Sequence, residues 1–442
     1  MNPYIIIFLI CNLFISPALY SSEKIDHYVW LKKALKLQRE IDLHAPLNEA
    51  TFIGTHNSYN SKFYANPVRY IDPNQLLSIT GQLESGVRSI EFDVHWTANN
   101  KLVLDLLLCH GNTKHIGCSL FDRHVMDGLK ELRDWLRANP NEIVLLYIDR
   151  YLDGHEPRLA ALLDDYLGNY IYKPAVLRSS HSSADCLSLP THLTKADILK
   201  AGKQLIIVTK GCDRSNAYYY EQNQFKQIWN DYVFAGIGDI PRKYYTFIDA
   251  TITNFTSYPD CGKSTIFHPD LFHTSVWRIY EDRTLNGSIG HPQKKIHFKI
   301  VSELMHCGIN WPTMDKVDKN DSRLNATIWS WMPEYPKTGD GHCAIYKIDQ
   351  GFENIPCEQI KAGYACQEEK THDMKAISII GTWSSGESTC QLLAGKNWHF
   401  AVPINATQLD KLKISMNATL LQTSWLNYVE DEQGSWHANQ AR

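Results

Sequence analysis

The feature that most constrains the fold of this chain is a series of short apolar segments, each of which stops at a polar or charged residue. Helical patterns lie between several of these segments, and strands that alternate with helices favour a parallel α/β sheet. Polar residues at successive strand ends favour a barrel, because the carboxyl ends of barrel strands meet on one face and form the active site. We therefore predict an α/β barrel with strands at 51–54, 87–94, 102–108, 142–149, 204–209, 244–248 and 307–312 and helices at 25–44, 82–86, 121–138, 156–168 and 298–304.

The character of the sequence changes after about residue 325. Trp, Gly and Cys become dense there, and helical periodicity fades except near 407–416. We predict a signal peptide at 1–22, a catalytic barrel domain at 23–325 and a smaller β-rich, disulfide-supported domain at 326–442.

The N-terminal segment indicates export. Residues 5–15 are almost wholly apolar, and small residues and then charge at Glu23 and Lys24 follow them. This is the order of a secretory signal peptide, although no basic residue precedes the apolar run. A membrane anchor is the alternative, but the run is short for a span. We expect cleavage near residues 18–22 and a secreted, extracellular or periplasmic protein.

The cysteine content and the net charge indicate the protein's cellular environment and the kinds of partner to expect. The ten cysteines outside the signal segment suggest disulfides in an exported chain, with buried free thiols as the alternative. The net charge of -4 gives no reason to expect nucleic acid as the main partner. Glycosylation sequons begin at Asn254, Asn286, Asn320, Asn325, Asn405 and Asn417.

The polar residues at the strand ends form one candidate site. Two histidines allow one group to accept a proton while the other donates one. An amide and three carboxylates supply the hard oxygen ligands that calcium needs, without the thiolate or multi-histidine pattern of a zinc site. A lysine suits a phosphate. Together they predict cation-assisted attack on a phosphodiester, by His56, Asn57, Glu91, Asp93, His110, Asp149 and Lys210.

Each of these residues has a structural alternative when it is taken alone. A single histidine is more often a hydrogen-bonded structural residue, and alternating acids on a strand could be one solvated face. Asp149 could form a surface ion pair with Arg150, and Lys210 could be an exposed charge. Cys109 could be a thiol nucleophile, but the nearby Cys118 makes a short-loop disulfide the better prediction. The joint pattern is favoured because every member falls where an apolar strand stops.

Four stretches resemble the catalytic X domain of phosphoinositide-specific phospholipase C. They occur in family order and with family-like spacing over residues 45–150: Gly54-Thr55-His56-Asn57-Ser58-Tyr59, Gly86-Val87-Arg88-Ser89-Ile90-Glu91-Phe92-Asp93, Cys109-His110-Gly111 and Val144-Leu145-Leu146-Tyr147-Ile148-Asp149. The resemblance implies a distorted TIM barrel in which His56 and His110 are the catalytic pair. The hydroxyl next to the phosphodiester would attack phosphorus and form a cyclic phosphate. His110 would be the general acid, and His56 would be the base or a hydrogen-bond donor to the transition state.

The resemblance also implies a calcium ion held by Asn57, Glu91, Asp93 and Asp149. The similar metal-independent bacterial branch carries Arg where this chain has Asp93 and Lys where it has Asp149, so this chain resembles the calcium-dependent type. Asp149 departs from the usual Glu, and its shorter arm could weaken the site or admit a water. Lys210 matches a family lysine loosely and is predicted to contact the substrate. No family motif is recognised beyond residue 210.

We therefore predict a secreted, calcium-dependent phosphoric diester hydrolase that cleaves the glycerol-phosphate side of inositol phospholipids at a membrane surface. Unphosphorylated phosphatidylinositol or glycosylated anchors are the expected substrates. A related barrel phosphodiesterase acting on glycerophosphodiesters or sphingolipids is one alternative. An inactive barrel that binds lipid or glycan is another.

The C-terminal region more faintly resembles a C-type-lectin-like domain. Stretches like the second half of that domain come first, around 329–331, Cys343, Cys357 and Cys366, and stretches like its first half follow around Cys390, 400–403 and 425–428. The order is reversed, and the sugar-binding carboxylate motifs are missing. A stabilising or substrate-orienting module is therefore favoured over glycan binding.

Overall fold

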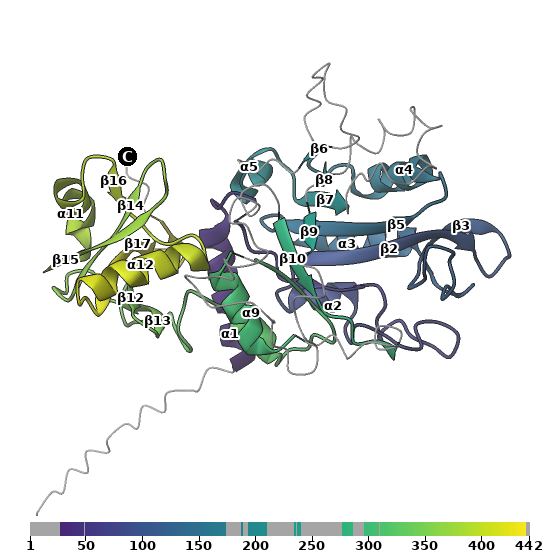
Figure 1. Cartoon of the computed structure of the whole chain (residues 1–442), viewed down its shortest axis with the longest axis horizontal. Helices are drawn as coiled ribbons and strands as arrows, with labels where there is room; N and C mark the ends of the chain where they lie inside the picture. The colour runs from purple at the N-terminus through teal and green to yellow at the C-terminus, as the bar shows by residue number, and fades with distance from the viewer. Residues whose placement is uncertain are drawn as a thin grey trace, which may run out of the picture.

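The computed structural model describes residues 27–47, 49–173, 187–188, 193–209, 234–235, 237–239, 276–285, 296–308 and 310–438. Two β-sheets organise these residues (Figure 1). The strands of the larger sheet lie between residues 54 and 314, and those of the smaller sheet lie between residues 343 and 437. The chain is therefore a mixed α/β protein with a second, β-rich part, as the sequence predicts.

The larger sheet has the order β6-β8-β7-β5-β2-β1-β11-β10-β9, and each neighbouring pair is parallel. Buried apolar runs build its centre, as a parallel sheet covered on both faces requires. Among the described residues no pairing joins β6 to β9, so the closure of the barrel stays a prediction. The strands are β1 (Gly54–Thr55), β2 (Ser89–Ala98), β5 (Val144–Tyr151), β6 (Leu187–Ser188), β7 (Leu205–Thr209), β8 (Phe234–Ala235), β9 (Ile237–Asp239), β10 (Val276–Tyr280) and β11 (Trp311–Met314).

Helices accompany this sheet at positions close to those predicted. In the third helix Val125, Leu129, Leu132 and Leu136 recur at helical spacing and are buried, which gives the helix one apolar side to pack. α5 and α10 are not predicted from the sequence, because a helix of five or six residues is too short to show periodicity. The helices are α1 (His27–Asp42), α2 (Ile79–Glu84), α3 (Val125–Ala138), α4 (Glu156–Leu167), α5 (Lys195–Lys200), α9 (Phe298–His306) and α10 (Ser322–Ala326).

The segment predicted as the third strand does not join the parallel series. β3 (Leu104–Leu108) pairs antiparallel with β2, and the short β4 (Arg123–His124) pairs with β3. The expectation was wrong because β2 continues beyond Val94 and the chain then turns back on itself. Since Leu108 returns to a position opposite Val94, the residues that follow β3 arrive beside Asp93.

The last predicted strand begins later than expected. Cys307 ends α9, and Gly308 follows it with a positive φ of 83°, a common way to terminate a helix. The strand is β11, which starts at Trp311. The predicted signal peptide, the strand at 244–248 and Lys210 lie outside the described residues. Within the described part of the chain, no helix is long and apolar enough to cross a membrane.

The smaller sheet has the order β13-β12-β17-β14-β15, with β16 on β14 and β18 on β17. Disulfides Cys343–Cys357 and Cys366–Cys390 support it, so the β-rich, disulfide-supported character is confirmed. The domain boundary near residue 325 stays a prediction. The elements are β12 (Cys343–Lys347), β13 (Gly351–Ile355), β14 (Ala362–Glu368), β15 (Met374–Gly381), α11 (Gly386–Leu393), β16 (Trp398–Phe400), α12 (Ala406–Ala418), β17 (Thr423–Glu430) and β18 (Trp436–His437).

The β-rich part packs on the side where the strands of the larger sheet begin. The side chain of Asn405 donates to the Glu49 carboxylate, upstream of β1, at 3.1 Å. Thr407 donates to the carbonyl of His306, upstream of β11, at 3.2 Å. In Figure 1 the β-rich part lies at one end of the molecule and the β2–β3 hairpin at the other. In the part of the chain that the structure describes, these contacts place the β-rich part at the beginning of the strands and not at their carboxyl ends, where the site is predicted.

Candidate active site

Three neighbouring parallel strands bring the predicted side chains to one edge of the larger sheet. β1 is followed directly by His56 and Asn57, β2 carries Glu91 and Asp93, and β5 carries Asp149. β1 pairs with β2 and β2 with β5, so that Asp93 lies opposite Asp149 in the register. Because the strands are parallel and end at the same edge, residues far apart in the sequence share one site.

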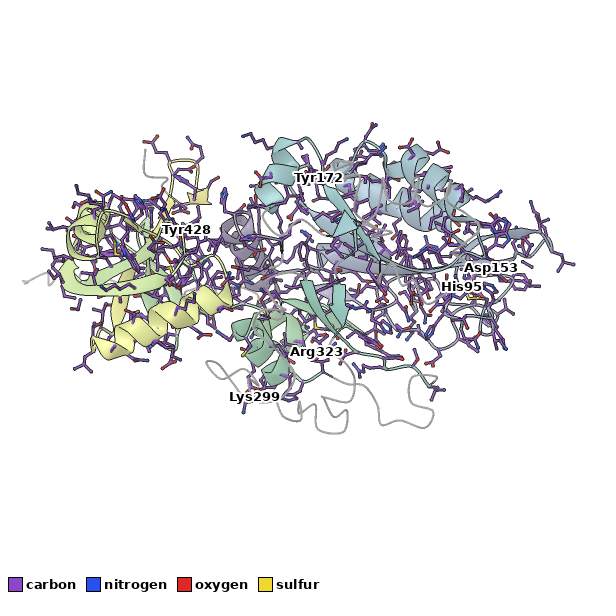
Figure 2. The ribbon with its side chains drawn as sticks, turned by 45° about the horizontal axis from the view of Figure 1, so that its top comes forward. His95, Asp153, Tyr172, Lys299, Arg323 and Tyr428 are labelled. Atoms are coloured by element: carbon purple, nitrogen blue, oxygen red, sulfur yellow. A yellow bond between two sulfur atoms is a disulfide. The ribbon has the colours of Figure 1, made fainter. Side chains whose placement is uncertain are left out.

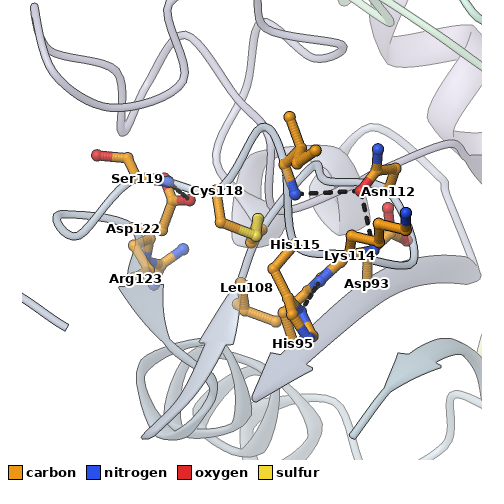
Figure 3. Close-up of a disulfide and its surroundings, with 12 residues drawn as sticks. Asp93, His95, Leu108, Asn112, Lys114, His115, Cys118, Ser119, Asp122 and Arg123 are labelled. Atoms are coloured by element: carbon orange, nitrogen blue, oxygen red, sulfur yellow. Dashed lines mark hydrogen bonds between the residues drawn. A yellow bond between two sulfur atoms is a disulfide. The ribbon is translucent and has the colours of Figure 1, made fainter. Parts of the chain in front are cut away.

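His110 reaches the same edge through the antiparallel hairpin. The N–H of Cys109 donates to the carbonyl of Asp93 at 3.1 Å. A disulfide joins Cys109 to Cys118, and Figure 3 shows it close to the strand that carries Asp93. The predicted short-loop disulfide is thus confirmed, and Cys109 is not a free nucleophile.

A second pair of histidines supports the His110 loop. The Nδ1 atoms of His95 and His115 lie 2.9 Å apart (Figure 3), and Nε2 of His115 lies 2.8 Å from a carboxylate oxygen of Asp153. Burial, together with the charges of His115 and His110, lowers the pKa of His95 to about 3. His95 is therefore a neutral structural histidine that ties this loop to β2, and His115 connects the loop to the chain beyond β5 through Asp153.

A carboxylate that the sequence analysis did not select lies against His56. Asp315 follows β11, the other parallel neighbour of β1, and its Oδ1 lies 3.3 Å from Nδ1 of His56. The Asp315 side chain is fully buried and accepts hydrogen bonds from the Asn74 and Gln75 side chains and the Arg283 N–H, at 2.9, 3.3 and 2.6 Å. A carboxylate held in this way fixes the orientation and tautomer of the ring. Its place just after a strand was the signal that could have identified it.

The two candidate catalytic histidines differ in charge. Burial by itself would lower the pKa of His56, but the charges of Glu91, Asp315 and Asp282 raise it to about 9. Burial and the positive charge of His56 lower the pKa of His110. At neutral pH the pair therefore carries one positive charge, which rests on His56.

The predicted calcium ligands concentrate negative charge. The Asn57 amide lies 2.9 and 3.1 Å from the two carboxylate oxygens of Asp93, and Tyr59 donates to Asp93 at 3.0 Å. Burial and the charges of Glu91 and Asp149 raise the pKa of Asp93. In one orientation the amide nitrogen of Asn57 donates to Asp93; in the other, the amide oxygen faces the carboxylate, which is how two ligands of one cation sit. One amide and three carboxylates are a donor set that fits a hard cation such as calcium.

Glu91 also has a protein cation as a partner. Nη1 of Arg278, on β10, lies 3.1 Å from Oε2 of Glu91, and both side chains are buried. Arg278 is not predicted as a site residue, because β10 is short and follows a long polar connection. The guanidinium carbon lies 4.2, 4.9 and 5.5 Å from the ring centroids of Tyr147, Tyr280 and Trp311.

The fold and the site together define an α/β protein of phosphodiesterase-like architecture, with two histidines at an acid-lined sheet edge. Residues 21–232 match the family model described as the Rv2075c PI-PLC-like domain. This match confirms the resemblance inferred from the motifs.

The chain is also similar to several other proteins. The chain is 25% identical over 348 residues to the uncharacterized protein Rv2075c of Mycobacterium tuberculosis, which covers 74% of this chain and 66% of that protein, slightly under two thirds of its length. It is 31% identical over 116 residues, 26% of each chain, to the PI-PLC X domain-containing protein At5g67130 of Arabidopsis thaliana. A calcium-dependent phosphoinositol-specific phospholipase C from Pseudomonas sp. matches 64% of this chain and 93% of its own, with 12% identity and a TM-score of 0.37.

Proposed function

We propose that this chain is an exported, calcium-dependent phospholipase C-like phosphodiesterase that cleaves the glycerol-phosphate bond of inositol phospholipids. The observation that carries the proposal is the convergence of His56 and His110 on one sheet edge, beside buried carboxylates, in the segment that matches the PI-PLC-like family model. Unphosphorylated phosphatidylinositol and glycosylated phosphatidylinositol anchors are the substrates that an exported enzyme would meet.

In the proposed reaction the inositol hydroxyl next to the phosphate attacks phosphorus, and the bond from phosphorus to the glycerol oxygen breaks. His56 accepts the hydroxyl proton at Nε2, because its Nδ1 is turned toward Asp315. His110 donates a proton to the leaving alkoxide, which gives diacylglycerol and a cyclic inositol phosphate. At rest the shared proton is on His56, so substrate binding must move it. The phosphodiester anion favours this transfer because a neighbouring negative charge raises the pKa of His110.

Asn57, Glu91, Asp93 and Asp149 would hold the calcium ion. When bound, the ion would supply positive charge that offsets the charge developing on the phosphoryl oxygens. Lys210 is proposed as a further contact to the substrate phosphate.

An apolar surface beside the site supports the proposal that the substrate is a phospholipid within a bilayer. Large apolar side chains that are 40% exposed or more lie in the loops after β1 and β3 and in the segment after β10. Hydrogen bonds from Ser119 to the Val68 carbonyl and from Arg69 to the Phe121 carbonyl hold the first two loops together. The connections after β1 and β10 follow the carboxyl ends of parallel strands, and β3 ends opposite Val94, next to Asp93, so all three lie on the site's side of the sheet. We call this surface the apolar rim: Phe63, Val68, Ile71, Ile116, Leu120, Phe121 and Leu285.

The apolar rim predicts a specific loss of vesicle binding. Phe63→Ser and Ile71→Ser should each weaken binding to phosphatidylinositol vesicles about tenfold, since a buried large apolar side chain contributes about 1.5–3 kcal/mol. Leu420→Ser is the matched control, because Leu420 is 85% exposed but belongs to the β-rich part. Sedimentation with vesicles measures binding without turnover. Equal losses in the rim variants and the control would reject the rim as the membrane contact.

The main test is hydrolysis of phosphatidylinositol vesicles by the full chain, with and without a calcium chelator. His110→Ala should lower turnover by about 10²–10⁴-fold, the usual contribution of a proton-transfer group. His124→Ala is the control, because His124 pairs with Asp105 at 3.0 Å and is not part of the candidate site. The chelator should abolish activity of the wild-type protein.

Each other outcome points elsewhere. Turnover that persists in the chelator would reject the calcium site, and full activity of His110→Ala would reject the two-histidine mechanism. Cleavage confined to choline lipids or glycerophosphodiesters would favour a related phosphodiesterase. No turnover of any lipid, together with glycan retention on an array, would favour a binding protein.

A further inference from the structure

A buried ion pair between Glu281 and Arg323 forms hydrogen bonds with both backbone polar groups of Asp315. Oε2 of Glu281 accepts the N–H of Asp315 at 2.7 Å. Nη2 of Arg323 donates to the carbonyl of Asp315, also at 2.7 Å. Nη1 of Arg323 bonds the same Glu281 oxygen that receives the Asp315 N–H. We call this arrangement the Glu281–Arg323 clamp.

Both members of the clamp are themselves held in place. Arg323 lies in α10, and Asp321, the N-cap of that helix, accepts both its backbone N–H at 2.8 Å and its Nε at 2.9 Å. The second carboxylate oxygen of Glu281 accepts the N–H of Ile296. The N–H of Glu281 donates to the carbonyl of Thr313 on β11 at 2.9 Å. The clamp therefore has little freedom to adopt a second geometry.

Burial makes this ion pair costly. Glu281 is 0% exposed and Arg323 is 7% exposed. Removing two charges from water costs several kcal/mol per ion, and well-packed apolar side chains often give equal or greater stability. General stability is thus a weak reason to place an ion pair here. The geometry points to a local reason, because the pair contacts both peptide groups that flank the Cα atom of Asp315.

We propose that Glu281 and Arg323 are positioning residues that hold the Asp315 carboxylate where it orients His56. The inference rests on the proposed function and adds two residues that act on His56 through Asp315. A displacement of about 1 Å in a catalytic group can cost about 10²-fold in rate. Figure 2 places Arg323 in the middle of the molecule, between the β-rich part and the far end marked by His95 and Asp153.

The test uses Arg323→Lys and Glu281→Gln in the full chain. Lys keeps the charge but lacks the planar fork that reaches Glu281 and the Asp315 carbonyl together. Gln keeps the shape of Glu281 but turns an NH2 group toward one of the two backbone N–H groups. We expect kcat on phosphatidylinositol vesicles to fall about 10–100-fold, with KM changed by less than about threefold, because Asp315 acts on the reaction step.

A double-mutant cycle separates positioning from general damage. In an Asp315→Asn background, Arg323→Lys should have no further effect on kcat, because the carboxylate that it positions is already gone. Arg39→Lys is the control, since Arg39 bonds Glu142 at 3.0 and 3.1 Å in a partly buried ion pair away from Asp315. This control should lower the melting temperature but not kcat.

Amide hydrogen exchange supplies a readout that needs no turnover. Exchange at Asp315 should be faster in Glu281→Gln than in the wild type. Unchanged exchange there, or Arg323→Lys and Asp315→Asn effects on kcat that multiply, would overturn the proposal. A wild-type protein that turns over no substrate would reject the proposed function instead. The clamp would then be judged by exchange at Asp315 alone, which supports it if faster and overturns it if unchanged.

Discussion

Replacing Asp315 by Asn should lower the pKa of His56 by a measurable amount. The pKa of His56 is raised from 6.5 to about 9, a difference equal to about 3.4 kcal/mol of preference for the charged ring. Burial opposes this shift, so the neighbouring carboxylates together contribute more than that amount. Asp315 acts through both a hydrogen bond and its charge, whereas Glu91 and Asp282 act through charge alone. We therefore expect Asp315→Asn to lower the pKa of His56 by about 1–2 units, or about 1.4–2.7 kcal/mol.

The assay is an NMR titration of the histidine rings in the full chain, with a chelator present. Asp153→Asn is the control, because Asp153 bonds His115 and should leave the pKa of His56 unchanged. Since the folded pKa of His56 lies above its unfolded value, its stabilising contribution is complete below about pH 6.5 and is lost as the pH rises to about 9. Asp315→Asn should flatten that loss. A pKa of His56 within about 0.3 of the wild-type value would refute the assignment of Asp315 as its partner.

Two further predictions concern the scaffold. Burial opposes the charge of Glu142, but Arg88 and Arg39 lower its pKa to about 2, so its contribution is complete above about pH 4.5 and is lost as the pH falls toward 2. Burial and Arg88 also lower the pKa of Arg39 to about 10, which offsets part of the stability that Glu142 contributes. We therefore expect Glu142→Gln to lower the free energy of unfolding by about 1–3 kcal/mol at pH 7. Denaturant titrations should find little effect at pH 2, and equal effects at both pH values would contradict the prediction. Replacing Cys109 and Cys118 together by Ala should lower the free energy of unfolding by about 2–3 kcal/mol, as measured by calorimetry. It should also lower kcat more than it changes KM, because His110 directly follows Cys109. Unchanged turnover would mean that the disulfide is not needed to hold the His110 loop in place.

The sequence predicted the parts of the fold in which local pattern and tertiary role agree. The apolar run before Asp149 became β5, and the apolar stripe of residues 121–138 became the buried side of α3. The apolar pattern of a strand does not indicate whether the strand runs parallel or antiparallel to its neighbour. The apolar pattern before His110 is the same for a parallel strand and for the returning arm of a hairpin, so β3 was placed in the wrong series. His110 still reached the expected edge, because the hairpin returns to Val94.

The site was predictable where a motif joined neighbouring strands and hidden where the partner came from a distant part of the chain. The set of His56, Glu91 and Asp93 followed from short segments with familiar spacing. Arg278 lies 187 residues after Glu91, and Asp315 lies more than two hundred and fifty residues after His56, in segments that become neighbours only through the sheet order. A strand-end position marks a candidate in such cases, but only the pairing of β1 with β11 shows which histidine it serves.

The charge of the assembled site explains why we expect phosphate binding to need a cation. Among the described residues at this edge, carboxylates outnumber cations: Glu91, Asp93, Asp149, Asp282 and Asp315 stand against Arg278 and protonated His56. The raised pKa of Asp93 follows from burial and from repulsion within this group. A phosphodiester carries a further negative charge, and like charges in an enclosed site repel strongly. A divalent cation at Asn57 and its acidic neighbours would remove that repulsion, so chelation should weaken substrate binding as well as turnover. The shortage of positive charge therefore links the acid set and the two histidines in one mechanism.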